Sequence, residues 1–297
     1  MILNTKTYIR HINRPEWGLG KVTQVLSQEK FSAFFINKGF IKLIYSPDLI
    51  QIETEIDSHP LLDNIDLAKA KISTTHTTLK QMVDTFLKIF PQGFNDERYY
   101  IEERKYKLEA GEKLTSLLSR ENFQKLLDKE NFEEITRLCM SITNKTNLIF
   151  PNEKMDLKDG LKTSANQEMF SKSLFGLFYG EQDLEIRFMN FANTLTSIKA
   201  DKWTTQTYFL YLSDPKKYLF MKPTITIKAA GVCNFELNYK PQLNWKTYMA
   251  LQEFGKHFKT ELSTQGDNLT PKDMIDVQSF FWSVANADDY KDDKNKS

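Results

Sequence analysis

The residues best placed to do chemistry are two carboxylates in the C-terminal part of the chain. Asp273 and Asp276 lie three positions apart, so on a helix they share one face near its N-terminus, where the helix dipole favours anions. A metal-dependent nuclease needs acidic ligands and a lysine that stabilises charge at a phosphate, and Lys222 or Lys272 could supply that lysine. Capping is the more common role of two acids in a first helical turn. Asp273 and Asp276 are therefore catalytic candidates, with capping as the alternative.

Other catalytic and metal-binding motifs are missing from the sequence. The four histidines form no His-x-x-x-His pair, and the two cysteines, Cys139 and Cys233, form no Cys-x-x-Cys pair. The glycine patterns of ATPases, α/β-hydrolases and Rossmann folds are absent as well. We therefore predict no metal and no cofactor, and we expect the cysteines to be structural. The acidic pairs at 102–103 and 133–134 are interpreted as solvated faces.

Lysines and aromatic residues are interleaved between residues 199 and 246. This stretch holds eight lysines against three acidic residues, a local excess of +5. Lysines pair with phosphates and release counterions, whereas exposed aromatic rings stack on unpaired bases. Under the alternative, the rings belong to the core and the lysines are only solvated. The candidate nucleic-acid contacts are Lys216, Lys217, Lys222 and Lys228 in this stretch, with Arg14 and Lys21 near the N-terminus.

The overall charge hides this local excess. Lys plus Arg number 40 and Asp plus Glu number 39, so the 297 residues carry a formal net charge of +1. That balance excludes a globally basic nucleic-acid coat protein and an acidic disordered protein. Residues 1–52 nevertheless hold seven basic residues against three acidic ones. Glycine is scarce and phenylalanine abundant, which favours helices packed through large aromatic rings over glycine-rich phosphate-binding folds.

The first fifty residues have the pattern of short strands joined by tight turns. Runs rich in β-branched and aromatic residues alternate with turn residues, and Gly39 after Asn37 and Lys38 suits a hairpin. Short strands of this kind can bury their faces only by curling into a small barrel. The predicted strands cover residues 7–12, 21–26, 31–36 and 40–44.

Two strings in this region resemble a known family. Residues 14–22 (RPEWGLGKV) and 34–42 (FFINKGFIK) look like a short bacterial tudor-like domain family of unknown function. That family is similar in turn to CarD-type transcription-coupling factors and to the C-terminal module of UvrD-type helicases. The resemblance covers residues 7–52. It implies an SH3-like barrel that docks a partner, with RNA polymerase or nucleoprotein as precedents, and it implies no chemistry.

Three residues of this region are candidates for partner binding, namely Trp17, Arg10 and Phe40. Trp17 lies in a turn, where a large ring either plugs the end of the barrel or forms a docking surface. Strings in the second half, at 220–224 (FMKPT), 243–248 (LNWKTY) and 271–280 (PKDMIDVQSF), resemble segments of uncharacterised bacterial proteins. No activity follows from that second resemblance.

From about residue 53 the apolar spacing changes to that of amphipathic helices. Residues 151–159 are predicted as a loop, and residues 203–219 fit either a helix or a strand pair. The last helix is predicted to start at Thr270, with Pro271 in its first turn. The other predicted helices include 79–90, 121–129, 131–143, 161–178, 181–199, 224–232 and 241–262.

The sequence therefore predicts a small all-β SH3/tudor-like barrel at 1–52 and a mainly α-helical domain at 53–287. A small hairpin is allowed near 203–222, and residues 288–297 are expected to be a disordered tail. We expect a cytoplasmic bacterial interaction protein that binds nucleic acid or a nucleoprotein partner, with a possible protein partner at the barrel and no membrane. The alternatives are a nucleic-acid-processing enzyme or nuclease subunit of a defence locus, and a protein–protein scaffold subunit.

Overall fold

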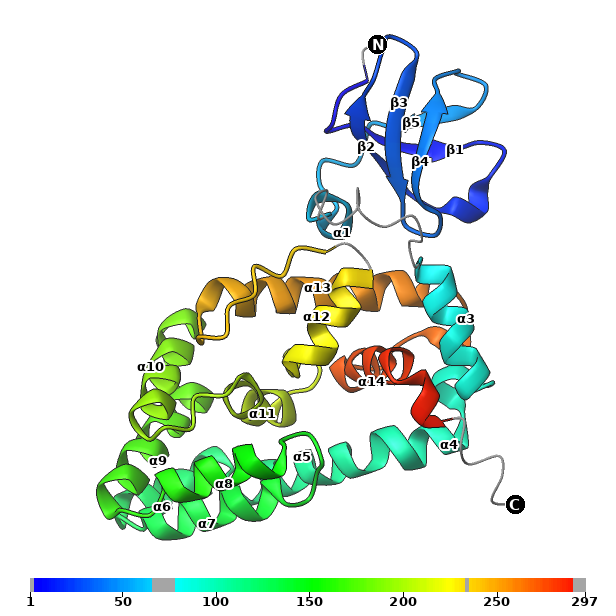
Figure 1. The fold of residues 1–297 in the computed structure, drawn as a ribbon. Helices are drawn as coiled ribbons and strands as arrows, with labels where there is room; N and C mark the ends of the chain where they lie inside the picture. The colour runs from blue at the N-terminus through cyan, green and yellow to red at the C-terminus, as the bar shows by residue number, and fades with distance from the viewer. Residues whose placement is uncertain (1–2, 66–77, 233–234, 291–297) are drawn as a thin grey trace. The chain divides into compact units, whose positions relative to one another are not determined.

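The N-terminal runs form the strands that their residue types predict. The computed structural model describes residues 3–65, 78–232 and 235–290. Five antiparallel strands lie in the order β4-β3-β2-β1-β5 (Figure 1). Gly39, with φ of 80°, completes the predicted tight turn at the start of β4. The strands are β1 Tyr8–His11, β2 Gly20–Val25, β3 Lys30–Phe35, β4 Gly39–Ile44 and β5 Ile50–Glu53.

The sheet is open, so the prediction of a small SH3/tudor-like barrel at residues 1–52 is wrong. Closure requires a continuous ladder around the sheet. Within the described residues, β5 pairs with β1 alone and β4 with β3 alone, which leaves both as edge strands. One face of the sheet is still buried, because Leu3, Trp17 and Tyr45 pack against it. The core of that face consists of Ile9, Val22, Phe31, Ala33, Phe35 and Ile50.

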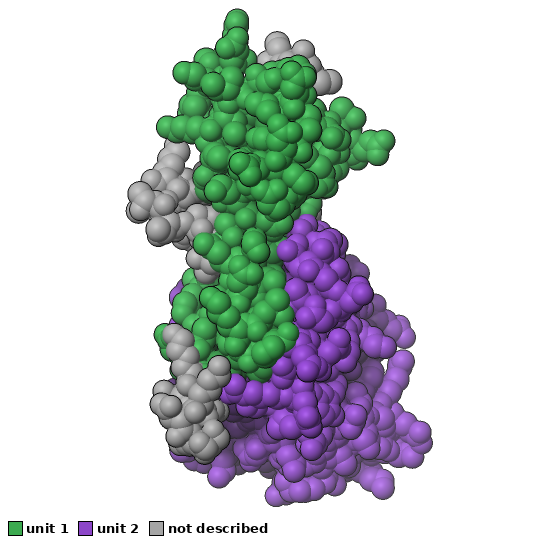
Figure 2. Space-filling view, turned by 90° about the vertical axis from the view of Figure 1, so that its right-hand side faces the viewer, with its two compact units in different colours: residues 1–91, 227–237, 282–297 green, residues 92–226, 238–281 purple. Residues whose placement is uncertain are grey.

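The chain folds into two compact units (Figure 2). Unit 1 contains residues 1–91, 227–237 and 282–297. Beyond the sheet it holds α1 (Pro60–Asp63) and α3 (Leu79–Ile89), which begins at a capping box of Thr78 and Gln81. The 3-10 turn Ala287–Tyr290 belongs to the same unit, where Tyr290 packs edge-on against Phe90 at 5.5 Å. The predicted tail therefore starts inside this turn, and residues 291–297 lie outside the described ranges.

Unit 2 contains residues 92–226 and 238–281 and is mostly helical. Its sequence supplies the large rings that fill the space between helices. Its helices are α4 Glu97–Tyr99, α5 Lys105–Leu117, α6 Arg120–Asp128, α7 Phe132–Thr143, α8 Pro151–Gly160, α9 Ser164–Tyr179, α10 Leu184–Ser197, α11 Trp203–Ser213 and α13 Trp245–Ser263, with parts of α12 Pro223–Val232 and α14 Met274–Ala285.

Two helices depart from the predictions, at 151–160 and at the last helix, and the choice left open at 203–219 between a helix and a strand pair resolves to a helix. Residues 151–160 are the helix α8 and not a loop, because Pro151 suits the first helical position and the Glu153 carboxylate accepts the Phe150 N–H at 3.1 Å. Residues 203–213 are the helix α11 and not a hairpin, since every residue from 203 to 212 is buried. The last helix starts at Met274, where Asp273 caps the Ile275 N–H at 2.9 Å. Among the described residues, no helix is both long and apolar enough to cross a membrane.

Candidate functional site

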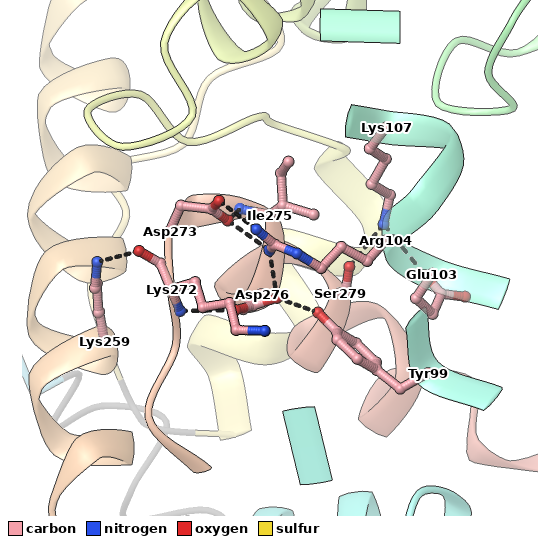
Figure 3. Close-up of polar contacts among 10 residues, drawn as sticks. All are labelled: Tyr99, Glu103, Arg104, Lys107, Lys259, Lys272, Asp273, Ile275, Asp276 and Ser279. Atoms are coloured by element: carbon pink, nitrogen blue, oxygen red, sulfur yellow. Dashed lines mark hydrogen bonds and ion pairs between the residues drawn. The ribbon is translucent and has the colours of Figure 1, made fainter. Parts of the chain in front are cut away.

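A helix with an irregular turn carries the polar cluster of unit 2. Residues 97–117 form one continuous helix in which Tyr100–Arg104 is π-helical, and the Lys105 N–H donates to the Tyr100 carbonyl five residues back. Single π turns inside helices are often found at functional sites. The side chains of Tyr99 and Arg104 point to Asp273 and Asp276 at the start of α14, and Lys107 reaches Ser279 further along that helix (Figure 3).

Arg104 joins both candidate catalytic acids. Its Nη2 lies 2.6 Å from Asp273 Oδ2, and its Nη1 lies 2.9 Å from Asp273 Oδ1 and 2.6 Å from Asp276 Oδ1 (Figure 3). The Tyr99 hydroxyl donates to Asp276 Oδ1 at 2.5 Å, and the Lys272 N–H donates to Asp276 Oδ2 at 2.7 Å. Asp273 Oδ1 also accepts the Ile275 N–H as the helix cap. All four carboxylate oxygens therefore accept hydrogen bonds. We call Tyr99, Arg104, Asp273 and Asp276 the buried ion cluster.

Burial sets the electrostatics of this cluster. The exposed fractions of the side chains are 8% for Arg104, 9% for Asp273 and 0% for Asp276. Burial raises the pKa of Asp276, and the positive charge of Arg104 opposes that shift. Burial also works against the charge of Arg104, but its hydrogen bonds to Asp273 and the two carboxylate charges raise its pKa above the usual value. The arginine therefore stabilises two acids that would otherwise be buried without a counter-charge.

The cluster does not have the form of a metal site. The two acids do lie together at the start of a helix, as the sequence predicts, but a guanidinium fills the position where a cation would bind. Within the described ranges, no group of three or more His, Cys, Asp or Glu side chains is arranged to hold a metal ion. Of the two lysines considered for phosphate chemistry, Lys222 is buried with its ammonium over the Phe150 ring at 4.3 Å. Burial lowers the pKa of Lys222.

A second buried pair continues the cluster along α5. Lys107, 1% exposed, lies 3.2 Å from Glu103 Oε2 and donates to the Ser279 hydroxyl at 2.7 Å. Burial lowers the pKa of Lys107, and the Glu103 carboxylate opposes that shift. The expectation of a solvated face is therefore wrong for Glu103. A pocket of about 190 Å³ lies beside Lys107, lined by Gly111, Leu212 and Ile275 among others, which is smaller than typical ligand pockets of roughly 300–1,000 Å³.

The aromatic residues of 199–246 are mostly core. Six aromatic rings of this stretch are buried, which supports the alternative that the rings belong to the core. They are Trp203, Tyr208, Tyr211, Tyr218, Phe220 and Phe235. Tyr239 and Trp245 are only partly buried. The ring of Trp245 packs against Phe188 at 5.7 Å and Tyr248 at 5.5 Å.

Three exposed lysines of unit 2 either follow these two rings directly in the sequence or lie next to Trp203, which is hydrogen-bonded to this segment. Lys202, Lys240 and Lys246 are exposed, and none of them has an ion-pair partner in the part of the chain that the structure describes. Trp203 anchors the segment, because its indole N–H donates to the Lys240 carbonyl at 2.9 Å. We call the set formed by Lys202, Tyr239, Lys240, Trp245 and Lys246 the lysine–tryptophan surface. The sequence pointed to the same stretch, but the contacts predicted within it were Lys216, Lys217, Lys222 and Lys228.

The other predicted nucleic-acid contacts are divided between the two units. Lys216 and Lys217 are exposed in the turn after α11, and Lys217 lies over the Tyr218 ring at 5.3 Å. Lys228, in unit 1, is exposed and donates to the Ala285 carbonyl. The remaining two also belong to unit 1. Arg14 is exposed, 3.9 Å from Glu16, and Lys21 forms an ion pair with Asp63.

The predicted partner-binding residues lie in the sheet region of unit 1. Trp17 is partly buried, packs edge-on against His11 at 4.7 Å and Phe35 at 5.4 Å, and contacts the core of the sheet. Phe40 packs against Phe34 at 4.9 Å. Arg10 forms an ion pair with Glu53 at 3.0 Å on an exposed face.

Comparisons with known proteins add no relative. No protein-family model matches the chain, and no curated protein or solved structure is similar to it. Function must therefore be argued from the residues alone.

The structure also locates one cysteine. Cys139 is buried in α7, and burial raises the pKa of its thiol, so the thiolate needed for nucleophilic attack is disfavoured. Cys233 lies outside the described residues.

Proposed function

We propose that this chain is a non-enzymatic interaction protein that holds nucleic acid, alone or within a nucleoprotein, through exposed lysines of unit 2. One observation carries the proposal. Lys202, Lys240 and Lys246 are exposed and unpaired within the described residues, whereas the acids proposed for catalysis are bound to Arg104. Lysines that are free of carboxylates are available to replace counterions along a phosphate backbone.

Local charge supports the same proposal. The two segments that meet at the Trp203–Lys240 hydrogen bond, residues 199–203 and 238–246, hold Lys199, Lys202, Lys240 and Lys246 against the single acid Asp201. That leaves a local excess of +3 in a chain whose overall charge is +1. The region is therefore positively charged and attracts a phosphate backbone.

The nuclease alternative has no comparable support. Asp273 and Asp276 would have to release Arg104 before they could bind a metal. The release would leave the buried guanidinium of Arg104 without a counter-charge.

Charge reversal of the three lysines tests the proposal. In the triple variant Lys202→Glu, Lys240→Glu, Lys246→Glu, we expect binding of a labelled oligonucleotide to weaken by more than tenfold. The plot of log affinity against log salt should also become shallower by about 2, since each lost phosphate contact contributes about 0.7 on single strands. Fluorescence anisotropy at several salt concentrations measures both quantities.

The matched control changes the same charge elsewhere in unit 2. Lys129, Lys145 and Lys158 are exposed and lack ion-pair partners among the described residues, so reversing them alters the net charge equally. This control should keep nearly all of the affinity. Equal losses in both triple variants, or no salt-dependent binding by the unchanged protein, would contradict the proposal.

A further inference from the structure

We infer that the lysine–tryptophan surface binds single-stranded nucleic acid, with an unpaired base stacked on Trp245. The inference rests on the proposed function and names the class of nucleic acid that this surface takes. Base faces are covered by their neighbours in a duplex, whereas an unpaired base offers its whole face to an aromatic ring.

Trp245 is held by buried rings and is still partly exposed, as a ring that stacks on a base must be. It is the first residue of α13 and packs against Phe188 and Tyr248, which themselves stack at 4.2 Å with an interplanar angle of 21°. These buried rings hold the indole in place, yet Trp245 remains partly exposed while Phe188 and Tyr248 are fully buried. A ring that is already fixed loses little conformational entropy when a base stacks on it.

The loop that precedes Trp245 is also fixed by hydrogen bonds. The Thr247 hydroxyl donates to the Asn238 carbonyl at 2.7 Å, and the Thr247 N–H donates to the Asn244 side chain at 2.8 Å. Together with the Trp203–Lys240 bond, these contacts hold both ends and the middle of the loop. Asn238, just before Tyr239, has a φ of 49°, which is a left-handed conformation.

Each partly exposed ring of this loop is followed directly by a lysine. Tyr239 and Trp245 are the partly exposed rings, and Lys240 and Lys246 follow them directly in the sequence. A single strand offers groups that match such a pair, because each nucleotide carries one base and one phosphate. A surface that offers a ring and a cation in turn therefore matches a single strand better than the continuous phosphate ridges of a duplex.

The test compares ring variants on matched probes. An oligo(dT), an oligo(U) and a DNA duplex of equal length, each fluorescently labelled, are titrated with the unchanged protein, Trp245→Leu and Trp245→Phe. We expect Trp245→Leu to weaken binding of both single strands about tenfold, in the range of base–aromatic stacking, and Trp245→Phe to keep most of the affinity. Duplex binding should be weaker from the start and unchanged by either substitution.

Two further readouts separate stacking from a merely structural role. The salt slope should be the same in Trp245→Leu as in the unchanged protein, because no charge is lost. The single strand should quench part of the tryptophan fluorescence, and this quench should disappear in Trp245→Phe although binding persists. Tyr239→Leu provides a second variant outside the α13 core and should weaken single-strand binding while the melting temperature stays unchanged.

The outcomes distinguish this inference from the proposed function. Salt-dependent binding that is equal for duplex and single strand, or that survives Trp245→Leu undiminished, would overturn the single-strand inference and leave the proposed function standing. Absence of salt-dependent binding to every probe would overturn both. A preference for oligo(U) over oligo(dT), or the reverse, identifies RNA or DNA as the source of the single strand.

Discussion

Replacing Arg104 with alanine is expected to lower the free energy of unfolding by about 3–5 kcal/mol. The substitution removes the cation that binds Asp273 and Asp276 and leaves two carboxylates in a site where Asp276 is 0% exposed. Uncompensated buried charge is among the most destabilising changes in a protein interior. Urea unfolding followed by circular dichroism measures the loss.

A surface ion pair supplies the control for Arg104. Arg137 binds Glu134 bidentately at 2.6 Å on α7 but is exposed. Arg137→Ala should leave the unfolding midpoint unchanged within error, because water replaces the lost partner. The double variant Arg104→Ala, Asp276→Asn should lose less than the sum of the single variants. A loss from Arg104→Ala as small as that from Arg137→Ala would show that the ion cluster contributes no stability.

The same variant should respond to pH in a defined direction. Without Arg104, nothing of comparable strength opposes the burial that raises the pKa of Asp276. A carboxyl with a folded-state pKa above its unfolded value binds protons more readily in the folded state, so stability increases as the pH falls through that folded pKa. The difference between Arg104→Ala and the unchanged protein should therefore be smaller at mildly acidic pH than at neutral pH.

The second large effect is expected at Gly93. This residue has a φ of 61°, and a Cβ there would lie 2.3 Å from the Asn268 carbonyl oxygen. Gly93→Ala combines the cost of a left-handed L-residue with a backbone clash between the 3-10 turns Gly93–Asn95 and Asp267–Leu269. We expect the free energy of unfolding to fall by about 2–5 kcal/mol.

Gly176 is the matched control, because alanine there is expected to change the free energy of unfolding in the opposite direction. It lies inside α9, and a Cβ there would meet nothing within 4 Å. Gly176→Ala should therefore raise the free energy of unfolding by about 0.5–1 kcal/mol, since alanine loses less backbone entropy in a helix. Chemical denaturation of both variants measures the contrast, and a Gly93→Ala variant as stable as Gly176→Ala would contradict it.

Local patterns in the sequence predicted elements well and their long-range pairing poorly. The strands near Tyr8, Val22, Phe31 and Phe40 follow from β-branched and aromatic runs between turns. Whether the last strand closes against β4 depends on contacts that no local run encodes, and β5 pairs with β1 alone in the described residues. Helix α8 was predictable in place of the loop at 151–159, because Pro151 and Glu153 form a recognisable helix start.

The candidate sites were also predictable only as far as local spacing determines them. The three-residue spacing of Asp273 and Asp276 correctly placed both acids at the start of a helix. Their partner Arg104 lies in a highly charged stretch that gives no sign of burial, although the four-residue spacing of Tyr99, Glu103 and Lys107 marks one helix face. Composition indicated that aromatic rings would pack together, but only the three-dimensional packing shows that Trp245 and Tyr239 stay partly exposed.

The sequence separation within the buried ion cluster determines how long Arg104 waits for its partners during synthesis of the chain. Arg104 is synthesised 169 residues before Asp273. At about 5–20 residues per second, this interval lasts roughly 10–30 seconds. Throughout that time Arg104 lacks its carboxylate partners and gains nothing by leaving water. Unit 2 therefore cannot reach its final packing until the ribosome has delivered α14, and chaperones have that interval in which to act on the unfinished chain.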